Sequence, residues 1–290
     1  MKTSISRRSA LKQTAVTGAA MLAMSRFTEA VDVKERRKGN VNHSVCRWCY
    51  DKIPLEDLCR ASKEMGIQSV ELQGPNEWPT IQKYGLTCAM ANGAGMGIEK
   101  GWNRLEHHDK LVESYSEVIP KAKNAGLSNI ICFSGNRAGL DDEQGIKNCA
   151  IGLKKLMPLA EKHGINVVME LLNSKVNHKD YQCDHTVWGV ELCKAVGSER
   201  FKLLYDIYHM QIMEGDVIRT IRDNHQYFSH YHTAGNPGRN EIDNTQELNY
   251  RPIMQAIVDT GFDGYVGQEF VPKRDAVASL KEAFDLCNVG

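Results

Sequence analysis

The sequence lacks three features that would have pointed to particular classes of protein. It has no excess of either charge, since Lys+Arg and Asp+Glu both total 36 in 290 residues. No strand–GxGxxG–helix or Walker phosphate-binding sequence occurs, and no second CxxC accompanies Cys46-Arg-Trp-Cys49. The balanced charge argues against a nucleic-acid surface or a polybasic membrane attachment. The missing motifs argue against a nucleotide site and a zinc ribbon. We therefore expect chemistry on small molecules and no nucleic-acid partner.

The sequence also gives no sign of a disulfide framework, although cysteine is not scarce. The nine cysteines are an odd number in a long chain, whereas disulfide-rich domains are short and carry an even number. Cys88, Cys132 and Cys193 fall within apolar strand or helix patterns, where a thiol behaves as a small hydrophobe. We expect core thiols.

The N-terminal region has no apolar run long enough to cross a bilayer as a mature helix. Ser6-Arg-Arg-Ser-Ala-Leu-Lys12 leads into a short stretch of small, weakly apolar residues, and Ala30 is one candidate cleavage point. Paired arginines before a modest apolar region are typical of a twin-arginine export signal. We predict a signal peptide at residues 1–30, a charged linker at 31–40 and export to the periplasm, without a stable membrane span in the mature protein. The alternatives are a disordered basic extension and a cytoplasmic location.

From residue 41 onward, short apolar runs alternate with longer segments of helical period, and many of the helical segments end at a glycine. The expected strands are 41–48, 69–72, 86–90, 129–133, 167–173, 201–206, 227–232 and 264–269. The expected helices are 55–65, 76–84, 109–125, 142–163, 186–196, 216–223, 249–260 and 275–287. Eight strand–helix units predict an α/β fold, a (β/α)8 TIM barrel that forms a single domain over residues 41–290. A doubly wound open sheet is the rival, but it would need a phosphate-binding switch point.

Four successive strands of this pattern finish on a group able to bind a metal or a proton: Glu170, Asp206, His232 and Glu269. Parallel strands in a barrel bring their C-terminal ends to one face, so these side chains are expected to converge. For each acid taken singly, the alternative role is to cap the next helix or to form an ion pair. Together they form a mixed oxygen and nitrogen set that suits Mg²⁺, Mn²⁺, Co²⁺ or Zn²⁺. His230 faces the same side as His232, and one of the two is expected to be structural.

Such a site supports proton transfer next to a carbonyl group. One carboxylate removes the α-proton and a second returns it, while the enediolate formed in between is stabilised by the metal. Glu170 and Glu269 stand on strands separated by two others, so they reach a substrate from opposite sides. We predict that these two glutamates are the catalytic pair of an isomerase or epimerase.

Several motifs resemble the hydroxypyruvate isomerases, which belong to the xylose isomerase-like barrels. The resemblance covers roughly residues 41–290 and is carried by Asp206-Ile-Tyr-His209-Met-Gln, Ala234-Gly-Asn-Pro-Gly-Arg239, Glu247-Leu-Asn-Tyr250 and Gly264-Tyr-Val-Gly-Gln-Glu269. It implies a divalent metal on Glu170, Asp206, His232 and Glu269, with Glu170 and Glu269 as the acid/base pair. It also implies that His209 and Arg239 bind substrate oxygens.

The resemblance implies conversion of hydroxypyruvate to tartronate semialdehyde, but His232 departs from the family pattern. The hydroxypyruvate isomerases carry Gln at this ligand position, whereas the ketose 3-epimerases of the same superfamily carry His. A ketose 3-epimerase or related sugar isomerase is therefore the alternative. Two further alternatives are metal-dependent hydrolysis of damaged DNA and sugar binding by a non-catalytic barrel without metal. The substrate is expected to be a hydroxy-carbonyl acid or a sugar, and a homo-oligomer is left open.

Polar loops after the early strands are expected to face the same side as the proposed site, either contacting substrate or capping helices. They contain Arg47, Asn103, His107, His108, Asn136 and Arg137. Trp48 and Trp102 are expected either to form an apolar wall over the substrate or to pack in the core.

Overall fold

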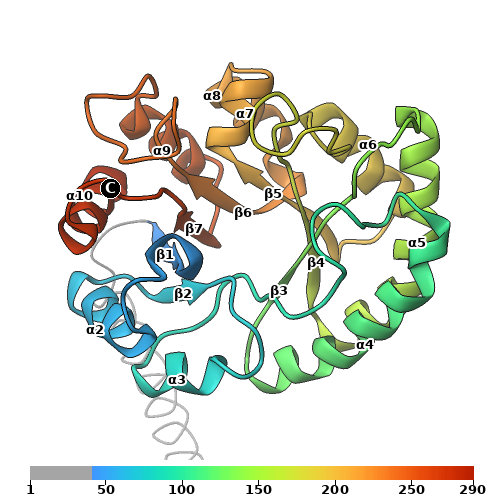
Figure 1. The fold of residues 1–290 in the computed structure, drawn as a ribbon, viewed down its shortest axis with the longest axis horizontal. Helices are drawn as coiled ribbons and strands as arrows, with labels where there is room; N and C mark the ends of the chain where they lie inside the picture. The colour runs from blue at the N-terminus through green and yellow to red at the C-terminus, as the bar shows by residue number, and fades with distance from the viewer. Residues whose placement is uncertain (1–40) are drawn as a thin grey trace, which may run out of the picture. The chain divides into compact units, whose positions relative to one another are not determined.

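The computed structural model describes residues 41–290, and the expected signal peptide and linker at residues 1–40 lie outside the described residues. Seven parallel strands form one curled sheet in the order β2-β1-β7-β6-β5-β4-β3 (Figure 1). The strands are β1 Asn42–Cys46, β2 Ser69–Glu71, β3 Asn129–Cys132, β4 Asn166–Glu170, β5 Phe201–Asp206, β6 Phe228–Thr233 and β7 Tyr265–Gln268. The α/β TIM barrel expected from the sequence is therefore confirmed.

The strand expected at residues 86–90 is wrong as a regular strand, although the segment does occupy the gap between β2 and β3. Isolated parallel bridges join Thr87 to Ser69 and Ala91 to Ile130. Between them, the amide of Ala89 donates to Ser69 Oγ at 2.9 Å, and its carbonyl accepts from Asn129 Nδ2 at 2.9 Å. Because these side chains take the place of backbone partners, the barrel closes here without a continuous ladder.

Helices connect successive strands and lie around the outside of the sheet (Figure 1). They are α2 Leu55–Met65, α3 Trp78–Lys83, α4 His108–Asn124, α5 Asp142–His163, α6 Thr186–Val196, α7 Ile207–Met213, α8 Val217–Asn224, α9 Tyr250–Asp259 and α10 Ala276–Cys287. Single 3-10 turns are η1 Arg47–Tyr50, η2 Leu105–His107 and η3 His225–Tyr227. Most bounds match the expected helices within two residues. The sequence did not predict α7, which begins immediately after Asp206.

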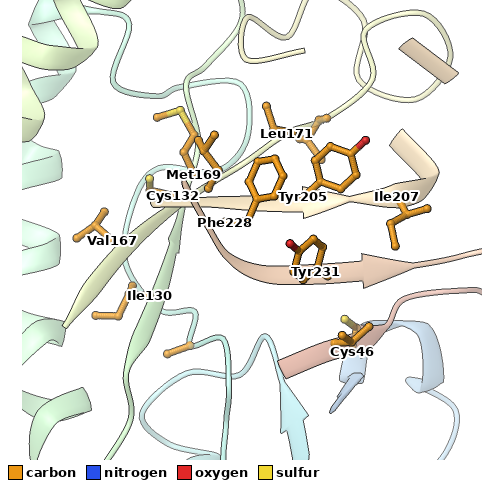
Figure 2. Packing of buried hydrophobic residues seen from close by; sticks show 14 of the residues in the cluster. Cys46, Ile130, Cys132, Val167, Met169, Leu171, Tyr205, Ile207, Phe228 and Tyr231 are labelled. Carbon is orange, nitrogen blue, oxygen red and sulfur yellow. The ribbon is translucent and has the colours of Figure 1, made fainter. Parts of the chain in front are cut away.

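Alternation along the strands separates the core from the barrel interior. Val167 and Met169 of β4 belong to the large apolar cluster between sheet and helices, as do Tyr205 of β5 and Tyr231 of β6 (Figure 2). Val168 instead belongs to a small cluster that also contains Met90, Ile131 and Leu204. Successive side chains of a strand point to opposite faces. The strand-end acids, two positions after Val168 and Leu204, therefore point into the barrel.

All nine cysteines lie among the described residues, where they are buried and form no disulfide. The expectation of core thiols is confirmed, including for Cys46 and Cys49. Within residues 41–290, no helix has the length and apolar character needed to cross a membrane.

Candidate active site

The structure brings together all four side chains expected at the strand ends. Glu170 is the last residue of β4, Asp206 the last of β5, His232 the penultimate residue of β6, and Glu269 directly follows β7. One ligand atom from each lies within 4.8 Å of the others, and all four residues are buried. His232 Nδ1 is 3.5 Å from Glu170 Oε1 and 2.8 Å from Glu269 Oε2. The topology of a parallel barrel produces this convergence.

The unpaired atoms of this group fit a divalent cation. Glu170 Oε1 and His232 Nδ1 are buried without a well-formed hydrogen bond, 3.5 Å from each other, and Nδ1 also lies 2.8 Å from Glu269 Oε2. Buried polar atoms normally find a partner, and several carboxylates in one dry place repel one another. Three carboxylates and one imidazole are a donor set that Mg²⁺, Mn²⁺, Co²⁺ or Zn²⁺ accepts. Glu170, Asp206, His232 and Glu269 are therefore the residues that would hold such an ion.

Sequence reasoning missed a fifth buried group, Glu71 at the end of β2. Its Oε1 is 2.7 Å from His232 Nε2 and 2.9 Å from His230 Nε2. His230 is therefore tied to Glu71, which fits the expectation that one of the two histidines is structural. The available signal was an acid inside the apolar run Ser69-Val-Glu-Leu72. Its histidine partners lie far along the chain, so the sequence did not reveal the pairing.

Arg239 lies against the carboxylates from the loop between β6 and α9. Its Nη2 is 2.5 Å from Glu269 Oε2 and 3.3 Å from Asp206 Oδ2. The guanidinium also stands over the rings of Trp48 and Tyr208, at 5.1 and 5.4 Å from their centroids. Arg239 adopts a φ of 56°, a backbone conformation that costs energy for a residue with a side chain. Two of its nitrogens are already engaged by the protein, because Nε also donates to the Glu269 carbonyl at 3.4 Å.

His209 is buried beside Asp206 and does not line the cavity described below. Asp206 caps α7, with Oδ1 accepting from the His209 amide at 3.1 Å. The His209 ring has Nδ1 2.5 Å from Asn173 Nδ2, and Nε2 lies 3.6 Å from Asp206 Oδ2. His178, whose ring centroid is 5.3 Å from that of His209, does line the cavity. His209 is thus adjacent to the ligand set, with its ring held by Asn173.

Burial and neighbouring charges push the pKa values of the carboxylates apart. Burial and the negative charge of Glu269 raise the pKa of Glu170. Burial, opposed by Arg239 and reinforced by Glu269, raises the pKa of Asp206 to about 8. For Glu269 the effect of burial is outweighed by Arg239 and His232, which hold its pKa well below the usual range. Neighbouring carboxylates with divergent pKa values are the pattern that acid/base catalysis requires.

For Glu71 and His232 as well, neighbouring charges outweigh the effect of burial on the pKa. Burial alone would raise the pKa of Glu71, but His230 and His232 outweigh it and lower that pKa below its usual range. Burial alone would lower the pKa of His232, but Cys46 and Glu269 outweigh it and raise that pKa. A cation arriving at His232 Nδ1 would therefore displace a proton, as metal binding commonly does.

A cavity of about 320 Å³ opens onto Glu170, Glu269 and Arg239. Its other polar residues are Asn92 and His178. Its remaining walls are apolar and are formed by Trp48, Leu72, Ile98, Ile131, Phe133 and Leu172. Concave, mainly apolar sites with a few convergent polar groups are the usual form of a small-molecule site. The cavity is therefore where a substrate can meet the carboxylates.

Of the loop residues expected near the substrate, only Trp48 reaches the cavity. Its Nε1 donates to Glu269 Oε1 at 2.8 Å. Trp102 is fully buried and packs against His108 and Tyr115, so its expected alternative as a core residue is the correct one. The other residues do not line the cavity and make contacts within the loops. Arg47 donates to the Tyr50 carbonyl, Asn103 donates to the Asn136 carbonyl and to Gln182, and Arg137 pairs with Asp184. The rings of His107 and His108 contact the carbonyls of Gly101 and Trp102.

Comparison with known proteins extends these observations. A model of the family described as "Xylose isomerase-like TIM barrel" matches residues 59–287. The putative hydroxypyruvate isomerase of Homo sapiens is 28% identical over 238 residues, covering 80% of both chains. The 2-oxo-tetronate isomerase of Haemophilus influenzae is 24% identical over 246 residues, covering 80% of this chain and 93% of its own.

Among solved structures, an AP endonuclease of family 2 from Brucella melitensis shares the fold. It superimposes with a TM-score of 0.71 at 24% identity and covers 83% of this chain and 97% of its own. The family match spans most of the described barrel, and the similarity to the two isomerases covers 80% and 93% of their own chains. The chain belongs to the xylose isomerase-like TIM barrel family and is an isomerase.

Proposed function

We propose that this isomerase is metal-dependent and moves a proton at the carbon next to a carbonyl group. The observation that carries the proposal is the pair Glu170 and Glu269. Each offers an oxygen to the same point as Asp206 and His232, and both border the cavity. A cation bound by the four side chains would supply the positive charge that stabilises an enediolate.

The two glutamates are held differently, which suits two steps of one proton transfer. Glu269 is fixed by Trp48 Nε1 on one oxygen and by Arg239 Nη2 on the other. Glu170 Oε1 has no hydrogen bond, so it is free to take or return a proton. β5 and β6 separate β4 from β7 in the sheet. The carboxylates therefore approach a substrate in the cavity from different sides, one removing the proton and the other returning it.

The leading substrate is hydroxypyruvate, converted to tartronate semialdehyde. Support comes from similarity to proteins named hydroxypyruvate isomerase and 2-oxo-tetronate isomerase. Arg239, His178 and Asn92 are cavity residues that can bind a substrate oxygen, and the guanidinium of Arg239 suits a carboxylate. Arg239 keeps Nη1 for this purpose, because its contacts with Asp206 and Glu269 use Nη2 and Nε.

A ketose 3-epimerase or related sugar isomerase is the second candidate, and three observations favour it. His232 stands where the hydroxypyruvate isomerases carry Gln. Most of the described residues that line the cavity are apolar. The one arginine or lysine among them, Arg239, is already paired with two carboxylates. The cavity also has room for a longer carbon chain than that of a three-carbon acid.

Deuterium exchange in ²H₂O separates the two candidates. Metal-loaded protein is incubated with hydroxypyruvate or with a ketohexose, and loss of the proton next to the carbonyl is followed by NMR together with product formation. We expect exchange and tartronate semialdehyde from hydroxypyruvate. Turnover of the ketose alone would reverse the order of the two candidates. Exchange with neither would contradict the proton-transfer chemistry for both substrate classes.

Removing the metal is expected to abolish turnover and to lower stability. Dialysis against a chelator should reduce kcat by more than about 100-fold, because the negative charge that develops on the substrate then has no counter-charge. Adding back Mn²⁺, Co²⁺, Mg²⁺ or Zn²⁺ at 100 times its Kd should raise the free energy of unfolding by about 2.7 kcal/mol. Melting curves at several metal concentrations measure this. Unchanged melting with every ion would contradict the metal site.

We also propose that residues 1–30 direct export through the twin-arginine route, as the paired Arg7 and Arg8 indicate. Replacing both by Lys is expected to keep the protein in the cytoplasmic fraction, because the pair is what the export machinery reads. Fractionation of cells that produce either form, with immunodetection, measures the distribution. Equal periplasmic amounts of both forms would contradict a twin-arginine signal.

A further inference from the structure

Glu71, the last residue of β2, contacts His232 of the candidate metal site inside the barrel. It is fully buried, and its Oε1 is approached by His232 Nε2 at 2.7 Å, His230 Nε2 at 2.9 Å and Cys46 Sγ at 3.4 Å. Its second oxygen makes no hydrogen bond. A buried carboxylate is costly unless it accepts hydrogen bonds, so these donors explain how the charge is tolerated at this position.

The contact decides which nitrogen of His232 faces the other carboxylates. An ionised carboxylate can only accept, so the nitrogen next to Glu71 carries the hydrogen. His232 therefore keeps Nε2–H toward Glu71 and presents Nδ1 to Glu170 and Glu269, 3.5 and 2.8 Å away. Nδ1 therefore faces the proposed ligand oxygens and is available as a ligand once its proton has left.

The neighbouring strand leaves space for this pair at Gly267 of β7. A Cβ at this position would lie 2.5 Å from Glu71 Oε1 and 2.9 Å from His232 Cδ2. Both distances are shorter than any normal contact, so a side chain at residue 267 would push the carboxylate and the imidazole apart. Strand pairing brings Gly267 directly beside His232. The absence of a side chain at Gly267 thus allows the side chains of Glu71, on β2, and His232, on β6, to meet inside the barrel.

We propose that Glu71 is a positioning residue that holds His232 with Nδ1 as the metal-binding nitrogen and so strengthens the binding of a divalent cation. A carboxylate behind a ligating imidazole fixes its tautomer and orientation, and losing it typically costs about 10- to 100-fold in metal affinity. The inference rests on the metal site of the proposed function, but not on the identity of the substrate.

The test measures metal binding by the full-length protein without substrate. Chelator-treated wild-type and Glu71→Gln proteins are titrated with Co²⁺ by calorimetry. The Gln variant keeps the shape of the side chain but lacks the negative charge, and we expect its Kd to rise about 10- to 100-fold. Glu71→Asp keeps the charge and is expected to recover part of the loss. Equal affinity of wild type and Glu71→Gln would overturn the inference.

His230→Gln is the matched control, because it removes the other imidazole bound to Glu71 and leaves every proposed ligand in the chain unchanged. Its Kd is expected to stay within about threefold of the wild type. An equal loss in both variants would show general damage to the interior and would also overturn the inference. If Glu71→Gln does not fold, Gly267→Ala tests the same contact, because its methyl group displaces the carboxylate without removing it.

Nitrogen-15 NMR of the histidine rings gives a second readout that is independent of metal. Metal-free wild type is expected to show His232 protonated at Nε2 throughout its titration. In Glu71→Gln a mixture of Nδ1–H and Nε2–H forms is expected once the ring is neutral, and an unchanged Nε2–H form would contradict the positioning role. If wild type itself binds no divalent cation, the proposed metal-dependent function fails together with the inference. Binding by wild type with no change in the variant refutes the inference alone.

Discussion

Replacing Glu269 by Gln is expected to lower kcat by about 10²- to 10⁴-fold at saturating metal. Gln keeps the shape of the side chain but cannot accept or return a proton. The same loss is expected for Glu170→Gln, since the two carboxylates face the cavity as a pair. Initial rates with hydroxypyruvate, measured after the metal content of each variant has been matched, give the comparison.

Glu191→Gln is the control for these variants. Glu191 is exposed on α6 and pairs with Lys194 of the same helix, so its loss should leave kcat unchanged. Because Glu170 and Glu269 are also expected metal ligands, their variants should bind the ion more weakly as well. A Glu269→Gln protein that retains most of the wild-type kcat would remove Glu269 from the proton transfer, and the same outcome for Glu170→Gln would remove Glu170.

The convergence of the four ligand-type residues was predictable from the sequence because two local rules determine it. A barrel places the C-terminal ends of its strands on one face, and alternation along a strand decides which side chains point inward. Asp206 closes a recognisable apolar run, whereas Glu170 lies inside the expected strand 167–173, and the strand ends at Glu170 in the structure. Helix ends were predictable for a similar local reason: Gly66 and Gly164 adopt the positive φ expected of C-caps.

The parts that the sequence did not predict depend on contacts between distant residues. Glu71 looked like an ordinary acid on a short strand, because its role depends on His230 and His232. The segment 86–90 has the pattern of a strand, because nothing local shows that the side chains of Ser69 and Asn129 bind its backbone. The sequence did not predict the helix α7, although a helix cap was the alternative role expected for Asp206, which does cap this helix.

The second large effect is expected from Arg239→Met in the metal-free protein. Arg239 is the cation that contacts Asp206 and Glu269, and its side chain is only 13% exposed. Breaking a buried ion pair by removing one partner leaves an uncompensated charge and typically costs about 3–5 kcal/mol. We expect the free energy of unfolding to fall by about this amount, as measured by urea denaturation.

Arg274→Met serves as the control for that measurement. Arg274 is half-exposed, and its two shortest ion pairs are with Asp243 and Glu282 at the surface, where an ion pair contributes about 0–1 kcal/mol. Adding the divalent cation should restore part of the stability of Arg239→Met, because the ion supplies positive charge to the same carboxylates. Equal losses in the two variants would mean that Arg239 does not compensate buried charge.

The most direct test of the metal site is anomalous diffraction from crystals of the full-length protein grown with Mn²⁺. The account predicts one strong peak at about 2.2 Å from Nδ1 of His232 and from oxygens of Glu170, Asp206 and Glu269. No peak among these four residues, or a peak bound elsewhere in the protein, would contradict the central claim.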